Sequence, residues 1–313
     1  MVVTLTSMFE HYNFQEFDFD LSPTWCNNYF TCPFKFRCAK ILNLKPVYTY
    51  KSYLIEGSLF HKIAELFFKY IKFDKINYYD EKTTKHYMMN VCLSLIPDKI
   101  ARYRERIDVY LRNFVDYEYE RMEAIFDLLG STKEAFYRFY IPYFREKQQS
   151  LEDQKRGIRF KIDLCYRIPK FLYDNKIEEL MLGDYKTGKS YDDFLDESVN
   201  RQLIFPIPFL NTGRVPRYVA GIYVHENIKV KLREVSGQQF YGLKLEFDKI
   251  LNSIKNKEFP KTYKFCKWCE YMVYCFANDG IYERIKAYRR FNRYDNVQKD
   301  FNDDDDDLFK YSL

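Results

Sequence analysis

The sequence predicts a mixed α/β chain built around one sheet, and three patterns lead to this fold class. Apolar residues recur at helical spacing in 56–71, and again in 238–257. The segment 157–169, "GIRFKIDLCYRIP", alternates strictly between apolar and polar side chains, as a strand with one buried face does. Helical and strand patterns follow one another along the chain, which is typical of helices packed on a sheet.

The composition of the chain excludes several classes of protein. The chain has 313 residues, of which 47% are apolar and 19% aromatic, so it is globular and long enough for a substantial core. No apolar run reaches the roughly 18 residues of a membrane helix. The first residues show no signal peptide, so we expect a reducing cytoplasm, where the eight cysteines serve as ligands and core residues rather than disulfides. The net charge of +5 is weak evidence for an anionic partner.

The first half of the chain is mainly helical in pattern. We expect a loose leader over residues 1–20, and a short helix starting at Ser22-Pro23. After the helix at 56–71, residues 72–92 are polar and predict a connection. Helical spacing returns over 98–150, which indicates a helical subdomain or insertion.

The second half of the chain contains the segments that we predict to be strands. After 157–169, the segment 179–190 is a short apolar strand that ends in a turn, and 217–235 predicts a hairpin around His225-Glu226-Asn227. The helix at 238–257 and the cysteine motif follow. A basic helix over 283–299 precedes the acidic run Asp303 to Asp307, which we interpret as a solvated end.

Two acidic residues and a lysine form a candidate metal site. Asp163 lies on the polar face of its strand, and Asp184 and Lys186 are two residues apart, so they point to one side of theirs. If the two strands are neighbours, the three side chains converge. A divalent cation would remove the repulsion between the carboxylates, Lys186 would steady charge developing on phosphorus, and His61 could add an imidazole ligand.

Three cysteines, Cys266, Cys269 and Cys275, lie in the segment "FCKWCEYMVYC". Three thiolates are an incomplete set for most tetrahedral metal sites or clusters, so a fourth ligand must come from elsewhere. By spacing alone, Cys26, Cys32 and Cys38 all remain open as the fourth. Four thiolates suit either an iron–sulfur cluster or zinc.

Five motifs, in order over residues 22–275, resemble those of RecB-like PD-(D/E)XK nucleases with an iron–sulfur cluster, such as CRISPR-associated RecB-type exonucleases and the exonuclease V family. They are "SPTWCNNYFTCPFKF", "GSLFHKI", "GIRFKIDLCYRI", "GDYKTGKS" and "CKWCEYMVYC". The resemblance implies a restriction-endonuclease-like core with a mixed central sheet. It also implies a helical insertion at about 72–150, and a cluster that ties the N- and C-terminal segments. The nuclease domain would span 21–282, with the basic helix and acidic tail in 283–313.

The resemblance also implies roles for individual residues. Asp163, Asp184 and His61 would bind one or two Mg²⁺ or Mn²⁺ ions, and Lys186 would be the catalytic lysine. Cys32, in its Cys-Pro context, would complete a [4Fe–4S] cluster, with zinc as the alternative. Relatives carry a Gln-x-x-x-Tyr motif, of which this chain keeps Gln202 but has Pro206 at the tyrosine position. Because proline disrupts a helix, we expect that helix to be short or broken.

The implied activity is hydrolysis of DNA, with a single-stranded 5′ to 3′ exonuclease favoured, in repair, recombination, replication or CRISPR adaptation. The implied setting is the cytoplasm of a prokaryotic cell or a virus-infected host cell, with a helicase or CRISPR or recombination factor as a candidate partner and a homo-oligomer as a candidate assembly. A catalytically impaired DNA-binding or scaffold protein is the alternative, and Pro206 favours it. Cationic and aromatic side chains near these motifs are candidate DNA contacts: Lys35, Arg37, Tyr185, Lys189 and Arg201.

Overall fold

The computed structural model divides into two compact units, Met1–Asn27 with Tyr50–Asn252, and Asn28–Thr49 with Ser253–Leu313. It describes residues 5, 7–46, 51–97, 103–148, 154–172, 175–189, 196–210, 214–225, 227–262, 266 and 269–276. The expected basic helix and acidic run lie outside the described residues. None of the helices in these ranges is long and apolar enough to cross a membrane.

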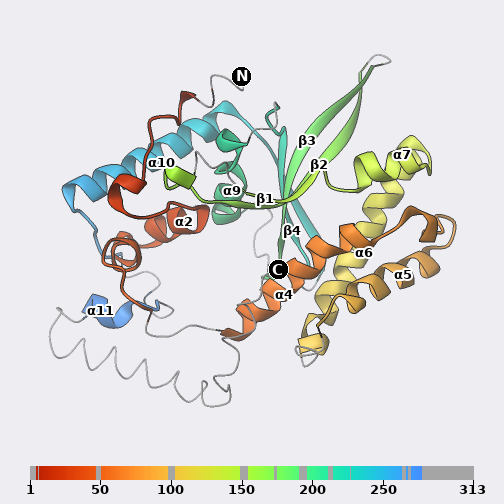
Figure 1. Cartoon of the computed structure of the whole chain (residues 1–313), viewed down its shortest axis with the longest axis horizontal. Coiled ribbons are helices and arrows are strands. Elements are labelled where there is room, and N and C mark those ends of the chain that lie inside the picture. Colours follow the sequence, from red (N-terminus) through yellow and green to blue (C-terminus); the bar gives the residue numbers. More distant parts are fainter. Residues whose placement is uncertain are drawn as a thin grey trace. The chain divides into compact units, whose positions relative to one another are not determined.

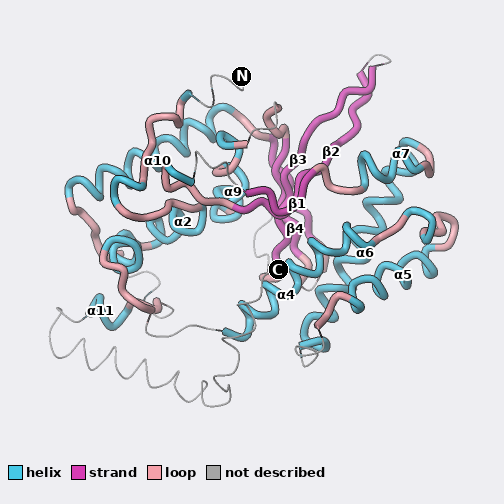
Figure 2. The backbone as a smooth tube through the Cα atoms, viewed as in Figure 1, coloured by secondary structure: helices cyan, strands magenta, loops and turns pink. Residues whose placement is uncertain are grey.

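The first unit contains the sheet and most helices (Figures 1 and 2). Its helical elements are η1 (Gln15–Phe17), α4 (Lys51–Tyr70), η3 (Phe73–Lys75), α5 (Glu81–Ser94), α6 (Arg104–Leu129), α7 (Lys133–Ala135), the π-helix η5 (Phe136–Tyr140), α9 (Glu197–Ile204), η6 (Ile207–Phe209) and most of α10 (Gly237–Asn256). Its strands are β1 (Phe144–Gln148), β2 (Lys161–Leu172), β3 (Asn175–Lys186), β4 (Tyr218–Tyr223) and β5 (Lys229–Glu234).

The five strands form one mixed sheet in the order β1-β2-β3-β4-β5. Among these five described strands only the β3–β4 pair is parallel, and its crossover contains α9. The other pairs are antiparallel, including the hairpin expected around His225. Helices α4, α5 and α6 lie on one side of the sheet, and α9 and α10 lie on the other (Figure 1). This arrangement agrees with the predicted mixed α/β fold.

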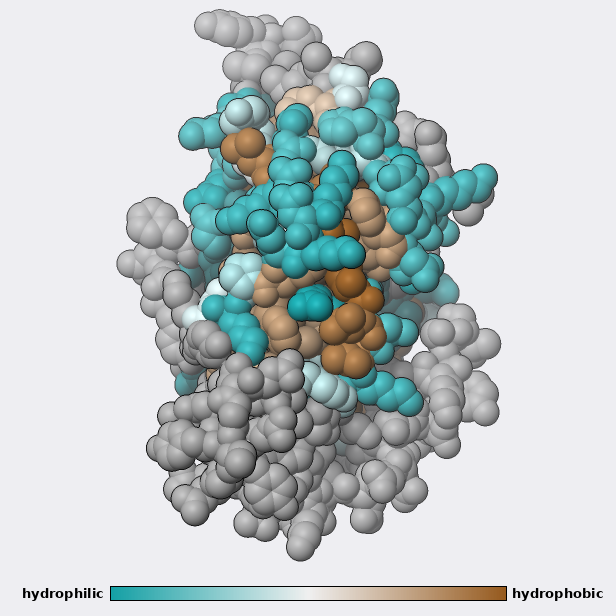
Figure 3. All heavy atoms as spheres, turned by 90° about the vertical axis from the view of Figure 1, so that its left-hand side faces the viewer, coloured by the Kyte–Doolittle hydropathy of each residue, from teal (hydrophilic) through white to brown (hydrophobic). Residues whose placement is uncertain are grey.

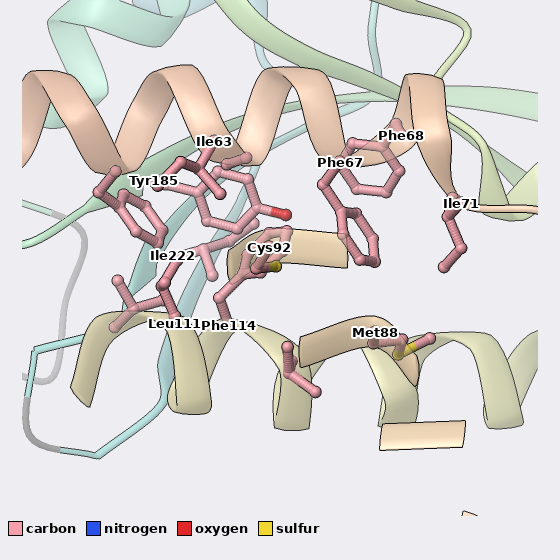
Figure 4. Close-up of a cluster of buried hydrophobic side chains, with 14 of the residues drawn as sticks. Ile63, Phe67, Phe68, Ile71, Met88, Cys92, Leu111, Phe114, Tyr185 and Ile222 are labelled. Carbon is pink, nitrogen blue, oxygen red and sulfur yellow. The ribbon is translucent and has the colours of Figure 1, made fainter. Parts of the chain in front are cut away.

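One core fills the space between the sheet and α4, α5 and α6. In Figure 4, Phe67 of α4 points toward α6, and Phe67, Phe68, Leu111 and Phe114 are all at most 3% exposed. Tyr185 and Ile222 contribute from the strands. On the face drawn in Figure 3, hydrophilic side chains cover much of the described surface, and apolar side chains show mainly in its central part.

The described part of the expected loose leader 1–20, residues 5 and 7–20, packs against the rest of the first unit and is not loose. Phe9, Tyr12 and Phe14 are at most 1% exposed, and all three rings contact Phe247 of α10. The Tyr12 hydroxyl donates to Asp248 at 2.6 Å. Aromatic residues this early in a chain bury as readily as any others when a groove receives them, and sequence spacing gave no sign of that groove.

Two elements in the insertion also differ from expectation. The polar connection at 72–92 contains α5, which buries a narrow row at Thr84, Met88 and Cys92 and is capped by Asp80 through a 3.0 Å bond from the Thr83 N–H. The segment expected to be helical to 150 ends in β1, which pairs with β2. A short edge strand gains its hydrogen bonds from a distant partner, so its own sequence pattern is weak.

The second unit is small. It contains the end of α2 (Pro23–Thr31), α3 (Pro33–Phe36), the π-helix η2 (Arg37–Ile41), the end of α10 and α11 (Met272–Phe276). Pro33 stands at the first position of α3, where its missing N–H costs nothing. The Thr262 hydroxyl donates to the Thr31 carbonyl at 2.8 Å, which joins residues 231 positions apart within this unit.

Candidate active site

The strand register brings the two predicted aspartates together. In the antiparallel β2–β3 pair Leu164 faces Gly183, so Asp163 and Asp184 stand opposite one another one step further along. His61, on α4, places Nδ1 3.0 Å from Asp163 Oδ2. One ligand atom from each of His61, Asp163 and Asp184 lies within 4.8 Å of the other two. Three donors from three separate elements therefore meet at one point.

Gly57 eases the close approach of α4 to the end of β3. A Cβ atom at this position would lie 3.3 Å from Thr187 Oγ1, which is tighter than ordinary contact. Thr187 follows Lys186 directly, and His61 is four residues after Gly57 and therefore on the same face of α4. The glycine lets the helix carry its histidine up to the carboxylates.

Lys186 points to the same side as Asp184 and forms an ion pair with it. Its ammonium also donates to Gln202 Oε1 at 2.5 Å. Gln202 belongs to α9, which is capped by Asp196 and ends at Ile204, two residues before Pro206. The helix is short, as the proline predicted, yet it is long enough to bring Gln202 to the lysine.

Burial and nearby charges shift the pKa values of the two carboxyl groups in opposite directions. Burial would raise the pKa of Asp163, but its interaction with His61 and the Lys186 charge outweigh burial and lower it. At Asp184, burial and the charge of Asp163 outweigh the Lys186 ammonium and raise the pKa. Burial alone would lower the pKa of His61, whereas the two aspartates raise it. The acids therefore repel one another, and a cation between them would relieve this repulsion.

The donor set fits a divalent cation. Asp163 Oδ2 is buried and makes no hydrogen bond of normal geometry with the described residues, although it lies close to His61. A buried carboxylate oxygen without a donor is costly unless another partner takes its lone pairs. Two carboxylates suit Mg²⁺ or Mn²⁺, and the imidazole adds a nitrogen ligand. His61, Asp163 and Asp184 could hold such an ion.

Tyr185 points away from this site, so its predicted role as a DNA contact is wrong. It is 1% exposed, and its hydroxyl donates to Glu118 Oε1 of α6 at 2.5 Å. Tyr166 donates to the same oxygen at 3.2 Å, and Arg121 binds Glu118 Oε2 at 2.7 Å. Neighbouring residues of a strand point to opposite faces, so Tyr185 anchors the reverse side of the strand that carries Asp184.

The other predicted DNA contacts differ in the residues that surround them and in their exposure. Arg201 makes a bidentate ion pair with Glu246, at 2.7 and 2.8 Å, which occupies its guanidinium. In the second unit, Lys35 pairs with Glu270 at 3.0 Å, and the Arg37 guanidinium lies 5.9 Å from the centre of the Phe259 ring. Lys189 is exposed. For Lys35, Arg37 and Lys189, DNA binding stays a prediction.

The sequence patterns did not single out Tyr223, which lies beside the candidate active site. In the parallel β3–β4 pair it stands opposite Lys186, so the two side chains share a face. Burial and then the charges of Asp196 and Asp184 raise the pKa of Tyr223 to about 12. Two apolar strands can pair in many registers, and the sequence gave no signal for the one that places Tyr223 beside the lysine.

The four predicted cysteine ligands line one cavity of about 170 Å³ in the second unit. Cys32 comes from the start of α3, and Cys266, Cys269 and Cys275 come from the C-terminal segment. Cys38 belongs to the same unit but does not line the cavity, and Cys26 lies in the first unit. Burial raises the pKa of the Cys269 thiol to about 11.

The geometry above agrees with a comparison against protein families. The PD-(D/E)XK nuclease superfamily matches residues 20–276, which is most of the chain, so the chain belongs to this superfamily. Membership implies a hydrolase that acts on nucleic acid with the help of divalent metal ions. A search among curated proteins finds no match.

Proposed function

We propose that the chain is a metal-dependent deoxyribonuclease that hydrolyses single-stranded DNA from its ends, with the 5′ to 3′ direction favoured. One observation carries the proposal: His61, Asp163 and Asp184 converge within 4.8 Å, with Lys186 in an ion pair with Asp184. A purely structural fold has no need to gather two carboxylates that repel one another.

Each residue has a distinct part in the proposed reaction. His61, Asp163 and Asp184 would hold the ion, which when bound polarises the phosphodiester and acidifies a water molecule. Lys186 lies on the same face and would place its positive charge where negative charge develops on the phosphate. Gln202 accepts from the Lys186 ammonium at 2.5 Å and so fixes its direction. Gln202 is therefore a positioning residue.

The rival interpretation is a scaffold that has lost catalysis at Pro206. Gln202 argues against it, because the shortened α9 still brings this side chain to Lys186. The two interpretations differ in one measurable property, which is cleavage.

The test is digestion of end-labelled oligonucleotides with Mn²⁺, using protein purified without oxygen. We expect single-stranded DNA to be shortened from one end, circular single strands to resist, and Asp184→Asn to be inactive. The matched control is Asp108→Asn, an aspartate of α6 that pairs with Arg112 on the surface and should keep full activity. Binding without cleavage at any metal concentration would establish the scaffold instead.

For the cysteine cavity, a [4Fe–4S] cluster is the proposed occupant. The cavity volume supports it, because about 170 Å³ is well above the roughly 10–15 Å³ in which a single water molecule fits. Lys35 and Lys261 line the same cavity, and their positive charges would favour thiolates there. Such a group would join segments more than 200 residues apart and stabilise the folded second unit, since it closes a long loop.

Iron, sulfide and zinc analysis of the anaerobic protein tests this assignment. We expect iron and sulfide in equal amounts with a broad visible absorbance, all lost in Cys32→Ser. Cys38→Ser is the matched control, since this thiol is in the same unit but outside the cavity. Stoichiometric zinc without iron would assign the cavity to a structural zinc site.

A further inference from the structure

A row of basic side chains on β5 faces the candidate active site. The register places Lys231 opposite Gly221, which is opposite Asp184, and places Lys229 opposite Tyr223, which is opposite Lys186. Residues opposite one another in paired strands point to the same face. Lys231 therefore projects on the face of Asp184 and Lys186, and Gly221, between them, has no side chain.

Lys231 is buried in an unusual setting. It is 7% exposed, although it lies on an edge strand, whereas its neighbours Val230 and Leu232 are 46% and 57% exposed. Its ammonium lies 5.3 Å from the centre of the Tyr223 ring. Within the part of the chain that the structure describes, the ammonium makes no hydrogen bond or ion pair. The Nζ atom itself is not one of the buried polar atoms that lack a partner, so the ammonium reaches the surface on this face, where an anion can approach it.

We propose that Lys231, held against Tyr223, binds a phosphodiester of the nucleic-acid substrate, and that this phosphodiester lies next to the one that is cleaved. Adjacent strands lie about 4.8 Å apart, so the β5 backbone is roughly 10 Å from that of β3, which is within one or two nucleotides of the reacting phosphate. The inference rests on the proposed nuclease function. It adds a substrate contact on the β4–β5 side of the metal site.

Tyr223 supports this role through its own environment. Burial, and then the charges of Asp196 and Asp184, raise the pKa of Tyr223 to about 12, so the phenol is uncharged at neutral pH. A neutral aromatic ring beside an ammonium stabilises the cation without neutralising it. The ring therefore does not compete with an anionic substrate for the ammonium, as a carboxylate would. Lys229 and Arg233 share the face of Lys231 and would extend the attraction along the strand.

The experiment measures binding of a fluorescent single-stranded oligonucleotide to an Asp184→Asn parent, which cannot cleave, over a range of salt concentrations. Loss of one phosphate contact lowers the slope of log K against log salt by about 0.7 for single strands. We expect this change in Lys231→Met, which keeps the aliphatic stem. Lys231→Arg should retain the slope, and so should Lys133→Met, an exposed lysine of α7.

Methylphosphonate substitution then locates the contact. A neutral linkage near the cleaved bond should weaken binding to the parent at one position, and Lys231→Met should be insensitive there. An unchanged slope in a folded Lys231→Met, together with cleavage by the unsubstituted protein, overturns this inference alone. If the parent binds no nucleic acid and the unsubstituted protein cleaves none, the proposed function fails as well.

Discussion

The buried charges behind the active-site strand allow a quantitative prediction. Glu118 is fully buried on α6, and its carboxylate is shared by Arg121, Tyr166 and Tyr185. Arg121 has a 12% exposed side chain and also donates to the Tyr140 carbonyl at 2.7 Å. Glu118→Gln keeps the shape of the side chain but removes its charge, which leaves the Arg121 guanidinium buried without a counter-ion.

Removing one partner of a buried ion pair costs about 3–5 kcal/mol, because the remaining charge is desolvated and unpaired. We therefore expect Glu118→Gln to lower the free energy of unfolding of the first unit by about that amount. For a unit of this size each kcal/mol corresponds to about 2–4 °C, so the melting temperature should fall by roughly 6–20 °C. The double variant Glu118→Gln/Arg121→Met should recover part of the loss, since it also removes the unpaired charge of the Arg121 guanidinium.

Urea unfolding followed by circular dichroism measures the change. The control is Asp108→Asn, which breaks the Asp108–Arg112 pair on the same helix, where the Arg112 side chain is 70% exposed. That pair should contribute about 0.3–0.5 kcal/mol. Equal effects of Glu118→Gln and Asp108→Asn would refute the reasoning, because burial would then have no influence on the value of the ion pair.

Three further predictions concern the backbone, the metal and pH. Gly157→Ala should destabilise by about 1–3 kcal/mol from backbone strain alone, since φ is +70° and the new Cβ would lie 2.8 Å from the Phe19 carbonyl. Gly242→Ala, with open space in α10, should stabilise by about 0.5–1 kcal/mol; both are measured in urea. Mn²⁺ at 100 times its Kd should add about 2.7 kcal/mol in calorimetry, and an equal shift in Asp184→Asn would exclude this site. Hydrogen bonds from Thr83 lower the pKa of the Asp80 carboxyl group. The Asp80 cap therefore stabilises α5 fully above the pKa of the unfolded chain, and this stabilisation is lost as the pH falls through the lower pKa of the folded protein. Amide exchange in α5 should speed up over that pH range in the unsubstituted protein but not in Asp80→Asn.

Local patterns predicted the elements that are long or strictly periodic. Alternation in 157–169 marked the polar face of Asp163, and helical spacing marked α4 and α10. The same rules failed for α5, whose buried row is too narrow to stand out, and for β1, whose bonds come from a distant strand. The early aromatics were missed for a similar reason, because burial depends on what packs against a segment.

The residues of the candidate site divide in the same way. Asp184 and Lys186 share a face because they are two apart on one strand, which sequence alone establishes. Tyr223 and Lys231 join them only through two strand registers, and a shift of one residue would turn both side chains to the opposite face. Tyr185 shows the same dependence, since its neighbours suggested a role at the site while its own direction is toward Glu118.

The strand that carries Asp184 and Lys186 is therefore held from both sides by different chemistry. On one face Gln202 binds Lys186, and on the other Glu118 binds Tyr185, the residue between the two active-site positions. Loss of Gln202 should free the lysine and lower turnover with little change in stability. Loss of Glu118 should lower stability first. A variant of Gln202 that unfolds the first unit would show instead that the contact between α9 and Lys186 is mainly structural.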